Sequence, residues 1–216
     1  MKDLIFLVDF DRTITMNDST DELMNQYNPQ MVEEYQKSFR RGDLRVREYI
    51  KGLLESLKIT KDEYKEAVTK NLIIDPDFKK FIELGYEMRI VSAGTYENIL
   101  PNFEKEGIDI PVEHIYSNKL TFNEDNIEIN FPFDNEDSDE GICKKTILLK
   151  YKNRYKKVVI PMKKTSNHIF KIKTLDDDKI LEVTAEHPFY VINKEDPRIE
   201  LINYYKISTS LDLTFT

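Results

Sequence analysis

The sequence has little cysteine, no long apolar run and no excess of basic residues. Its single cysteine, Cys143, cannot form an intramolecular disulfide, which is typical of a reducing compartment. The apolar run Leu4 to Val8 is five residues long, too short for a membrane span or a signal-peptide core. The formal net charge of −8 argues against binding to a nucleic-acid backbone. We therefore expect a cytoplasmic protein that binds neither nucleic acid nor membrane.

Apolar residues are nevertheless abundant enough for a folded core. Hydrophobic residues make up 40% of the 216 residues, and 12 Phe and 12 Tyr are among them. Burial of this surface can offset the conformational entropy that is lost on folding. The length allows one domain of ordinary size and a small second module.

Strand and helix patterns alternate along the first 160 residues. Leu4 to Val8 predicts a buried parallel strand, and Glu87 to Val91 predicts the next strand. Between them, residues 19–70 show apolar residues at three- and four-residue spacing, which indicates three helices. Helices inserted at this point would form a cap. The pattern thus predicts an α/β fold, with a Rossmann-like parallel sheet and a helical cap insertion.

The character of the chain changes after Ile160. Residues 161–216 contain short alternating segments separated by polar turns, which predicts β-structure. We place a domain boundary near residue 160. The expected division is an α/β core at residues 1–160, with its helical cap at about 19–70, and a small β-rich appendage at residues 161–216.

Two aspartates one residue apart follow the first predicted strand. Asp9 and Asp11 can project from one loop, so that one carboxylate attacks phosphorus while the other transfers the leaving-group proton. A solvated acidic turn is the plain alternative. The apolar strand before the pair and Thr13 after it favour a catalytic loop.

Two further segments could hold a phosphate group. Ser92, Ala93 and Gly94 follow a strand and precede a helix, where a hydroxyl and backbone N–H groups can bind phosphate. Lys144 or Lys145, at the start of a helix, could neutralise phosphoryl oxygens. The plain alternatives are an ordinary strand-to-helix turn for the first segment and a solvent-exposed lysine for the second.

Together and in this order, the three segments resemble the haloacid dehalogenase superfamily, specifically its phosphoserine phosphatase-like branch. The resemblance implies hydrolysis of a small phosphorylated metabolite, with Mg²⁺ as cofactor and the cap closing over the substrate. The roles that it implies are the nucleophile for Asp9, the general acid/base for Asp11, Mg²⁺ binding for both, phosphate-holding hydroxyls for Thr13 and Ser92, a phosphate loop for Ala93 and Gly94, and the motif lysine for Lys144.

Within this branch, the chain is similar to the methionine-salvage 2-hydroxy-3-keto-5-methylthiopentenyl-1-phosphate phosphatases. The similarity runs through TITMND, RRGDLRVREYI, EINFPF and GICKKTILLK. It favours Lys144, directly after Cys143, over Lys145. It also makes Arg41, Arg45 and Arg47 of the cap candidates for contacting an anionic substrate. Their plain alternative is that they are exposed helix charges.

The sequence departs from the family pattern after the strand that ends at Ile160. A glycine-aspartate loop of the type GDGxSD should complete the magnesium site there, but the sequence reads KKVVIPMKKTSNH. Mg²⁺ prefers near-octahedral oxygen ligation, so this departure bears directly on metal binding and turnover. The acidic run from Asp176 to Asp178 could replace the missing ligands, although such a run is usually a hairpin turn.

The C-terminal segment resembles part of an intein or Hint-type self-processing domain. Thr184 and His187 occupy the positions of its TxxH motif, but a nucleophile near residue 160 and a C-terminal His-Asn pair are lacking. Three functions therefore stay open. The first is a phosphomonoester hydrolase acting through an aspartyl-phosphate, the second a catalytically inactive phosphate-ligand-binding remnant, and the third a Hint-type fragment. The sequence assigns no oligomeric state.

Overall fold

The computed structural model describes residues 2–161 apart from 125, 136–137, 139 and 153, together with four later strands. The elements that build the site are, in chain order, β1 (Lys2–Val8), α1 (Ser19–Tyr27), α2 (Pro29–Arg41), α3 (Val46–Glu55), α4 (Lys61–Lys70), α5 (Pro76–Glu83), β2 (Met88–Thr95), α6 (Tyr96–Glu106), a 3-10 turn (Val112–His114), β3 (Ile115–Phe122), β4 (Ile127–Asn130), α7 (Lys144–Lys152) and β5 (Tyr155–Pro161). The later strands are β6 (Ile169–Lys173), β7 (Ile180–Thr184), β8 (Pro188–Asn193) and β9 (Ile199–Asn203).

The described strands form a central sheet in the order β4-β3-β2-β1-β5-β8-β9. Strand β1 pairs in parallel with β2 and β5, and β2 pairs in parallel with β3. Strands β3 and β4 form an antiparallel hairpin. This arrangement confirms the prediction of an α/β fold with a parallel sheet.

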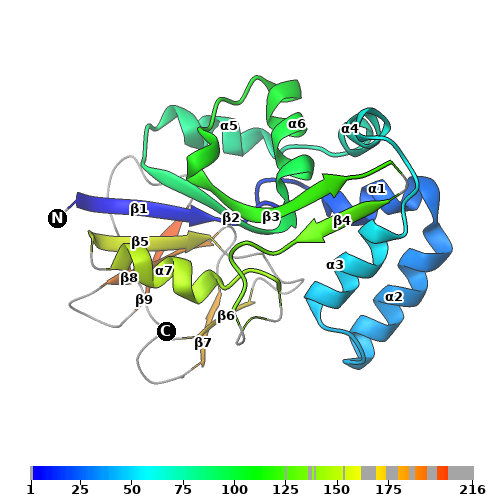
Figure 1. Cartoon of the computed structure of the whole chain (residues 1–216). Coiled ribbons are helices and arrows are strands. Elements are labelled where there is room, and N and C mark those ends of the chain that lie inside the picture. The colour runs from blue at the N-terminus through cyan, green and yellow to red at the C-terminus, as the bar shows by residue number, and fades with distance from the viewer. Residues whose placement is uncertain are drawn as a thin grey trace.

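Both faces of β1 are buried, which explains its continuous apolar sequence. Phe6 and Val8 face the cluster that α5 and α6 cover. Ile5 and Leu7 face the opposite cluster, to which α7 contributes. Figure 1 shows α5 and α6 on one side of the sheet and α7 on the other.

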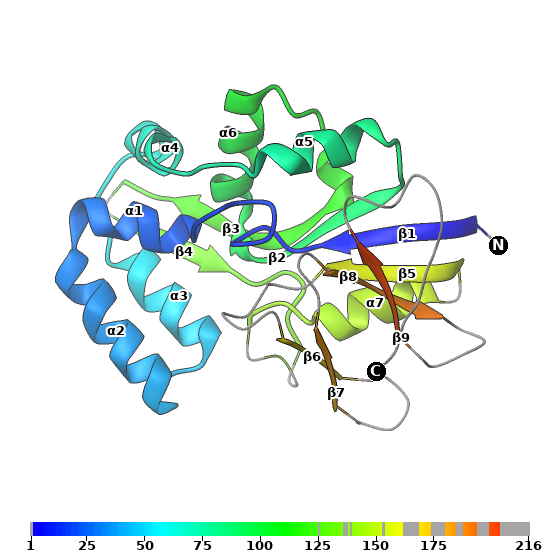
Figure 2. The ribbon, with the colours of Figure 1, turned by 180° about the vertical axis from the view of Figure 1, so that it is seen from behind.

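Helices α1 to α4 lie beyond the end of the sheet to which β1 points (Figures 1 and 2). They share a buried cluster with Leu120, Ile127 and Ile129 of the β3-β4 hairpin. The first predicted helix of this insertion is divided into α1 and α2. The division lies at Asn28, which is the N-cap of α2. Its side chain accepts from the Met31 N–H, and Pro29 is the first residue of the new helix.

The sheet continues past β5 through antiparallel pairing with β8, which in turn pairs with β9. Strands β6 and β7 form a separate antiparallel pair. β-Structure in the C-terminal segment was predicted, and pairing along β5 covers an edge that would otherwise offer unpaired backbone groups. The proposed division into two domains at residue 160 stays a prediction.

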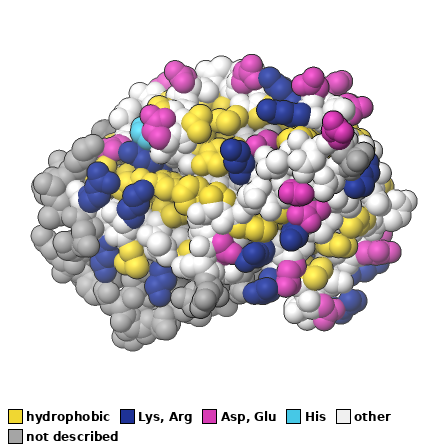
Figure 3. Space-filling view, viewed as in Figure 1, with side chains coloured by type: hydrophobic (Ala, Val, Ile, Leu, Met, Phe, Trp, Pro, Cys, Tyr) yellow, Lys and Arg dark blue, Asp and Glu magenta, His cyan; other side chains and the backbone are white. Residues whose placement is uncertain are grey.

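Several charged groups on the described surface form ion pairs with near neighbours. Acidic and basic side chains are interspersed over the face in Figure 3. Examples are Lys65 with Glu104 and Lys79 with Glu106, each pair at 2.7 Å. Among the described residues, no helix combines the length and apolar character needed to cross a membrane.

The packing around β1 predicts a large cost for truncating Phe81. Its ring is 1% exposed and meets the ring of Phe6 edge-on at 4.8 Å. Phe81→Ala should lower the free energy of unfolding by about 3–5 kcal/mol, because it leaves a cavity. Urea unfolding followed by circular dichroism measures this change. Leu84→Ala, at a position that is 47% exposed, is the control. Equal losses in the two variants would contradict the assigned core.

Candidate active site

A cavity of about 430 Å³ opens at the carboxyl ends of β1 and β2, where open parallel sheets bind ligands. Its walls come from two parts of the chain. The core side comprises Asp9, Asp11, Arg12, Ala93, Gly94, Glu140 and Lys144. The side formed by α1 to α3 and the residue before α1 comprises Asp18, Thr20, Asp21, Gln36, Phe39, Arg40, Val46, Tyr49 and Ile50.

Asp9 and Lys144 meet in this cavity although 135 positions separate them in the sequence. Asp9 directly follows β1, and Lys144 is the first residue of α7. The Lys144 Nζ lies 3.2 Å from Asp9 Oδ2 and 3.0 Å from Glu140 Oε2. Burial alone would lower the pKa of Lys144, but the two carboxylates raise it above its usual range. Lys145 is exposed, so the structure brings Lys144 and not Lys145 to Asp9.

Asp11 is held between the start of α1 and the end of β2. Its Oδ1 accepts from the Ser19 N–H at 2.7 Å. The pKa of Asp11 is raised to about 8, chiefly because the group is removed from water and also because the Asp18 and Asp9 carboxylates lie nearby, while the hydrogen bonds from Ser19 act in the opposite direction. A carboxyl group that keeps its proton near neutral pH can donate that proton to a leaving group.

The predicted phosphate loop is the end of β2. Ser92 is fully buried, and its Oγ accepts from the Gly94 N–H at 3.0 Å. Ala93 and Gly94 line the cavity, whereas Ser92 is not among the lining residues. A Cβ atom on Gly94 would lie 3.0 Å from Asp11 Oδ2, so the loop approaches Asp11 closely only because residue 94 is glycine. The N-terminus of α6 begins directly after this loop, where N–H groups favour an anion.

Thr13 belongs to the loop after β1 but is not among the cavity-lining residues. Its backbone N–H donates to the Phe10 carbonyl at 3.2 Å. The neighbouring Arg12 has a φ of 58°, in the left-handed region that residues other than glycine rarely adopt. Its backbone N–H donates to Thr15 Oγ1 at 2.9 Å. The loop after β1 is therefore a tight turn fixed by its own hydrogen bonds.

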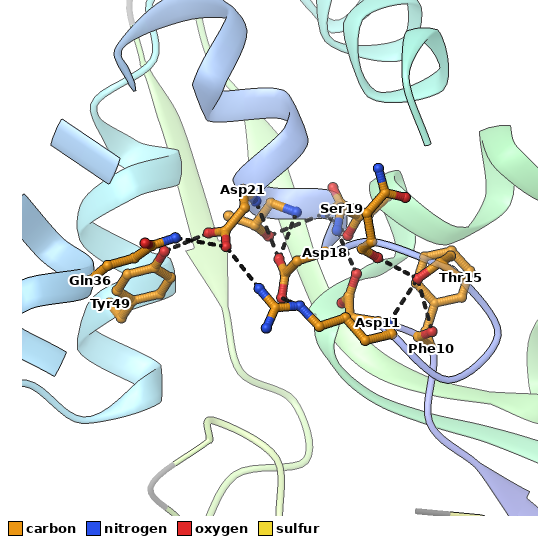
Figure 4. A network of polar contacts seen from close by, with 12 residues as sticks. Phe10, Asp11, Thr15, Asp18, Ser19, Asp21, Gln36 and Tyr49 are labelled. Carbon is orange, nitrogen blue, oxygen red and sulfur yellow. Dashed lines mark hydrogen bonds and ion pairs between the residues drawn. The ribbon is translucent and has the colours of Figure 1, made fainter. Parts of the chain in front are cut away.

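A polar network ties this loop to the cap (Figure 4). The Arg12 guanidinium contacts Asp21 at 3.1 Å and Asp18 at 3.7 Å. Asp21 also accepts from Gln36 Nε2 at 3.0 Å and from Tyr49 Oη at 2.5 Å. One carboxylate of α1 thus contacts the loop after β1, α2 and α3 together.

The three predicted cap arginines do not line the cavity. Arg41 pairs with Asp43 at 2.7 Å, and Arg45 pairs with Glu48 at 3.0 Å. Arg47 pairs with Asp134, and its guanidinium lies 4.6 Å from the centre of the Phe131 ring.

The neighbouring Arg40 lines the cavity instead. Its guanidinium donates to Gln36 Oε1, a neutral group, at 3.1 Å.

Several cavity-lining residues have no role predicted from the sequence; they are Arg12, Asp18, Asp21, Arg40, Tyr49 and Glu140. Asp18 could have been recognised from the sequence as a helix N-cap, because an aspartate there directly precedes a helical pattern. In the structure its side chain caps α1 by accepting from the Thr20 and Asp21 N–H groups. Arg12 also lies within the DFDRT segment. The others are polar or charged residues in helices or loops, and only the tertiary structure shows which of them face the cavity.

The Asp9 carboxylate and the oxygen atoms of Asp11 are hard ligands of the kind that Mg²⁺ prefers, and Mg²⁺ commonly binds one or two carboxylates with waters and phosphate oxygens. Within the described part of the chain, no three His, Cys, Asp or Glu side chains are grouped to hold a metal. Residues 162–168, which directly follow β5, lie outside the described residues, as do Asp176 to Asp178 and His187. Thr184 is the last residue of β7. The oxygen ligands of Asp9 and Asp11 therefore match the ligand chemistry of Mg²⁺.

The Hint-like assignment of the C-terminal segment stays a prediction.

The sequence matches no protein-family profile but is similar to curated phosphatases. The bifunctional enzyme MtnB/MtnX of Bacillus licheniformis is 29% identical over 162 residues, which cover 71% of this chain and 37% of the relative. The 2-hydroxy-3-keto-5-methylthiopentenyl-1-phosphate phosphatase of Bacillus mycoides is 25% identical over 154 residues, or 68% of this chain and 69% of the relative. The chain thus spans little more than a third of the bifunctional relative.

Two solved structures share the fold. A HAD family hydrolase from Salmonella enterica serovar Typhi superposes with a TM-score of 0.55 at 16% identity, over 71% of this chain and 52% of its own. A phosphoserine phosphohydrolase-like protein from Francisella tularensis has a TM-score of 0.51 at 24% identity, over 69% and 74%. None of these four proteins is named as an intein or Hint domain, so they lend no support to that resemblance.

Proposed function

We propose that this chain, a member of the haloacid dehalogenase family by fold and sequence similarity, hydrolyses a small phosphomonoester through an aspartyl-phosphate on Asp9. The observation that carries the proposal is the meeting of Asp9, Asp11 and Lys144 in one cavity, beside the glycine loop at the start of α6. A nucleophile, a proton donor and a cation at one phosphate-sized site are the groups that phosphoryl transfer requires.

In the proposed reaction, an Asp9 oxygen attacks phosphorus in line with the bond to the leaving oxygen. That bond breaks as Asp11 gives its proton to the leaving oxygen, and an alcohol departs. Asp11 then takes a proton from a water molecule that attacks the aspartyl-phosphate, which releases phosphate and restores Asp9. The Lys144 ammonium, 3.2 Å from Asp9, screens the charge of the phosphoryl oxygens throughout.

We assign Mg²⁺ as the cofactor, with Asp9 and Asp11 as its protein ligands. When bound, the ion would neutralise phosphoryl charge and draw the anionic substrate towards Asp9. Its remaining ligands would be water and phosphate oxygens. A catalytically inactive phosphate-ligand-binding protein is the second candidate, favoured by the departure from the GDGxSD pattern and by the lack of a three-carboxylate cluster in the described residues.

The cap half of the cavity suits a substrate with both apolar and oxygen-bearing parts. Phe39, Val46 and Ile50 offer apolar surface, and Arg40 with Gln36 offers hydrogen-bond donors. The substrate named for the Bacillus mycoides relative carries a methylthio group beside keto and hydroxyl groups. We propose a substrate of this kind, with Arg40 contacting its oxygen atoms in place of Arg41, Arg45 and Arg47.

Substitution of Asp9 and Lys144 tests the proposed chemistry. Mg²⁺-dependent phosphate release from a panel of small phosphomonoesters should fall by more than about a thousandfold in Asp9→Asn, which removes the nucleophile. Lys144→Ala should also lose most activity, whereas Lys145→Ala, at the exposed neighbour, should retain it. If the wild-type protein binds phosphate esters in calorimetry but releases no phosphate at any Mg²⁺ concentration, the binding-protein alternative replaces the enzyme.

Gly94→Ala tests the close approach of the phosphate loop to Asp11. The added methyl group would meet Asp11 Oδ2 at 3.0 Å and Ser92 Oγ at 3.2 Å. We expect kcat to fall at least about tenfold, because small displacements of catalytic groups are costly. Gly107→Ala is the control. The φ of 66° at Gly107 makes this a strained substitution, but the position has open space and follows the last residue of α6, at the opposite end of the helix from Gly94. An unchanged kcat in Gly94→Ala would contradict the assigned role of the loop.

Arg40→Gln tests the cap end of the cavity. For keto- and hydroxyl-bearing phosphomonoesters, kcat/KM should fall about tenfold, the usual effect of losing a charged hydrogen bond. Methyl phosphate is too short to reach α2, and its kcat/KM should change by less than about twofold. The matched variant Arg41→Gln removes an arginine that pairs with Asp43 outside the cavity lining. Equal effects of the two variants would show that Arg40 does not contact the substrate.

A further inference from the structure

Asn98, in the first turn of α6, is a fully buried amide with every hydrogen-bonding position filled. Its Oδ1 accepts from Tyr64 Oη and from Thr95 Oγ1, the latter at 3.0 Å. Its Nδ2 donates to Ser19 Oγ at 2.8 Å and to Thr20 Oγ1 at 3.3 Å. An asparagine side chain has two donors and two main acceptor sites, so this set of partners is complete.

These partners belong to parts of the chain that surround the candidate active site. Thr95 caps α6 directly after the phosphate loop, Ser19 and Thr20 begin α1, and Tyr64 belongs to α4. Asn98 and Ser19 are 79 positions apart in the sequence. One buried side chain thus joins the loop after β2 to the start of the cap insertion.

Ser19 carries this link to Asp11. The Ser19 Oγ accepts from Asn98, while its backbone N–H donates to Asp11 Oδ1 at 2.7 Å. Figure 4 shows Ser19 beside Asp11. Because Ser19 is fully buried and starts a helix, its position depends on a few fixed contacts, and the amide of Asn98 is one of them.

We propose that Asn98 is a positioning residue that orients the Asp11 carboxyl group through Ser19. This inference rests on the proposed function, in which Asp11 transfers the leaving-group proton. Asn98 contacts no reacting atom. Its effect is to fix the N–H group that holds one Asp11 oxygen, while Gly94 leaves room for the other. Such support for a catalytic group reduces the range of orientations that the group samples.

A matched control is available one turn further along α6. Asn102 is 1% exposed, and its Nδ2 donates to the Asn98 carbonyl at 2.8 Å and to the Val68 carbonyl at 3.4 Å. It is another buried amide that joins α6 to α4. Its side-chain bonds involve neither Ser19 nor Asp11, so Asn102→Ala removes comparable structural support without disturbing the link to Asp11.

The dependence on leaving group distinguishes positioning from simple destabilisation. The value of kcat/KM reports on steps up to transfer of the phosphoryl group to Asp9. For an alkyl phosphate, whose leaving oxygen needs a proton, Asn98→Ala should lower kcat/KM by about tenfold more than for 4-nitrophenyl phosphate, whose leaving group departs as an anion. Asn102→Ala should lower both values equally. Equal losses on the two substrates in Asn98→Ala would overturn the proposal.

Hydrogen exchange of the Ser19 amide, measured by NMR in the full chain, tests the same link without turnover. In Asn98→Ala, this amide should exchange about tenfold faster relative to core amides of β2, because its hydrogen bond to Asp11 is less constrained. In Asn102→Ala, the ratio should stay at the wild-type value. An unchanged ratio in Asn98→Ala would also overturn the proposal. If wild-type protein hydrolyses neither ester, the proposed function fails, and hydrogen exchange still decides whether Asn98 holds Ser19 on Asp11.

Discussion

The parallel pairing of β1 between β2 and β5 is the constraint on which the rest of the structure depends. It requires β1 to be buried on both faces, and it brings the carboxyl ends of β1 and β2 to the same edge of the sheet. Asp9 and Asp11 follow the first strand, and Gly94 lies at the end of the second. The chemistry of the candidate site is therefore a consequence of strand register as much as of residue type.

Buried and partly buried polar groups connect this edge to the cap. Asp21 joins Arg12 of the loop after β1 to α2 and α3, and Asn98 joins α6 to the first residues of α1. Polar groups removed from water are costly unless they are paired, so each network favours one arrangement of cap and core over others. Ser19 takes part in both sets of contacts, because its hydroxyl accepts from Asn98 and its backbone N–H donates to Asp11.

The alternation of strands and helices and the DFDRT loop could be predicted because they depend on local patterns: apolar runs, helical spacing and acidic residues after a strand. Lys144 required the family resemblance to distinguish it from Lys145. Arg40 could not be separated from Arg41, because their exposure to the cavity depends on how α2 packs. The bond between Asn98 and Ser19 joins distant segments and has no local signal. The division between α1 and α2 at Asn28 was visible as an Asn-Pro pair, but the apolar spacing across it indicated one helix.

The central claim is that Asp9 becomes covalently phosphorylated. Mass spectrometry of protein that is quenched in acid during turnover of a small phosphomonoester tests it most directly. The account predicts the added mass of one phosphoryl group on the peptide that contains Asp9, and its loss in Asp9→Asn. Turnover without this adduct, or an adduct that persists on another residue in Asp9→Asn, would contradict the account.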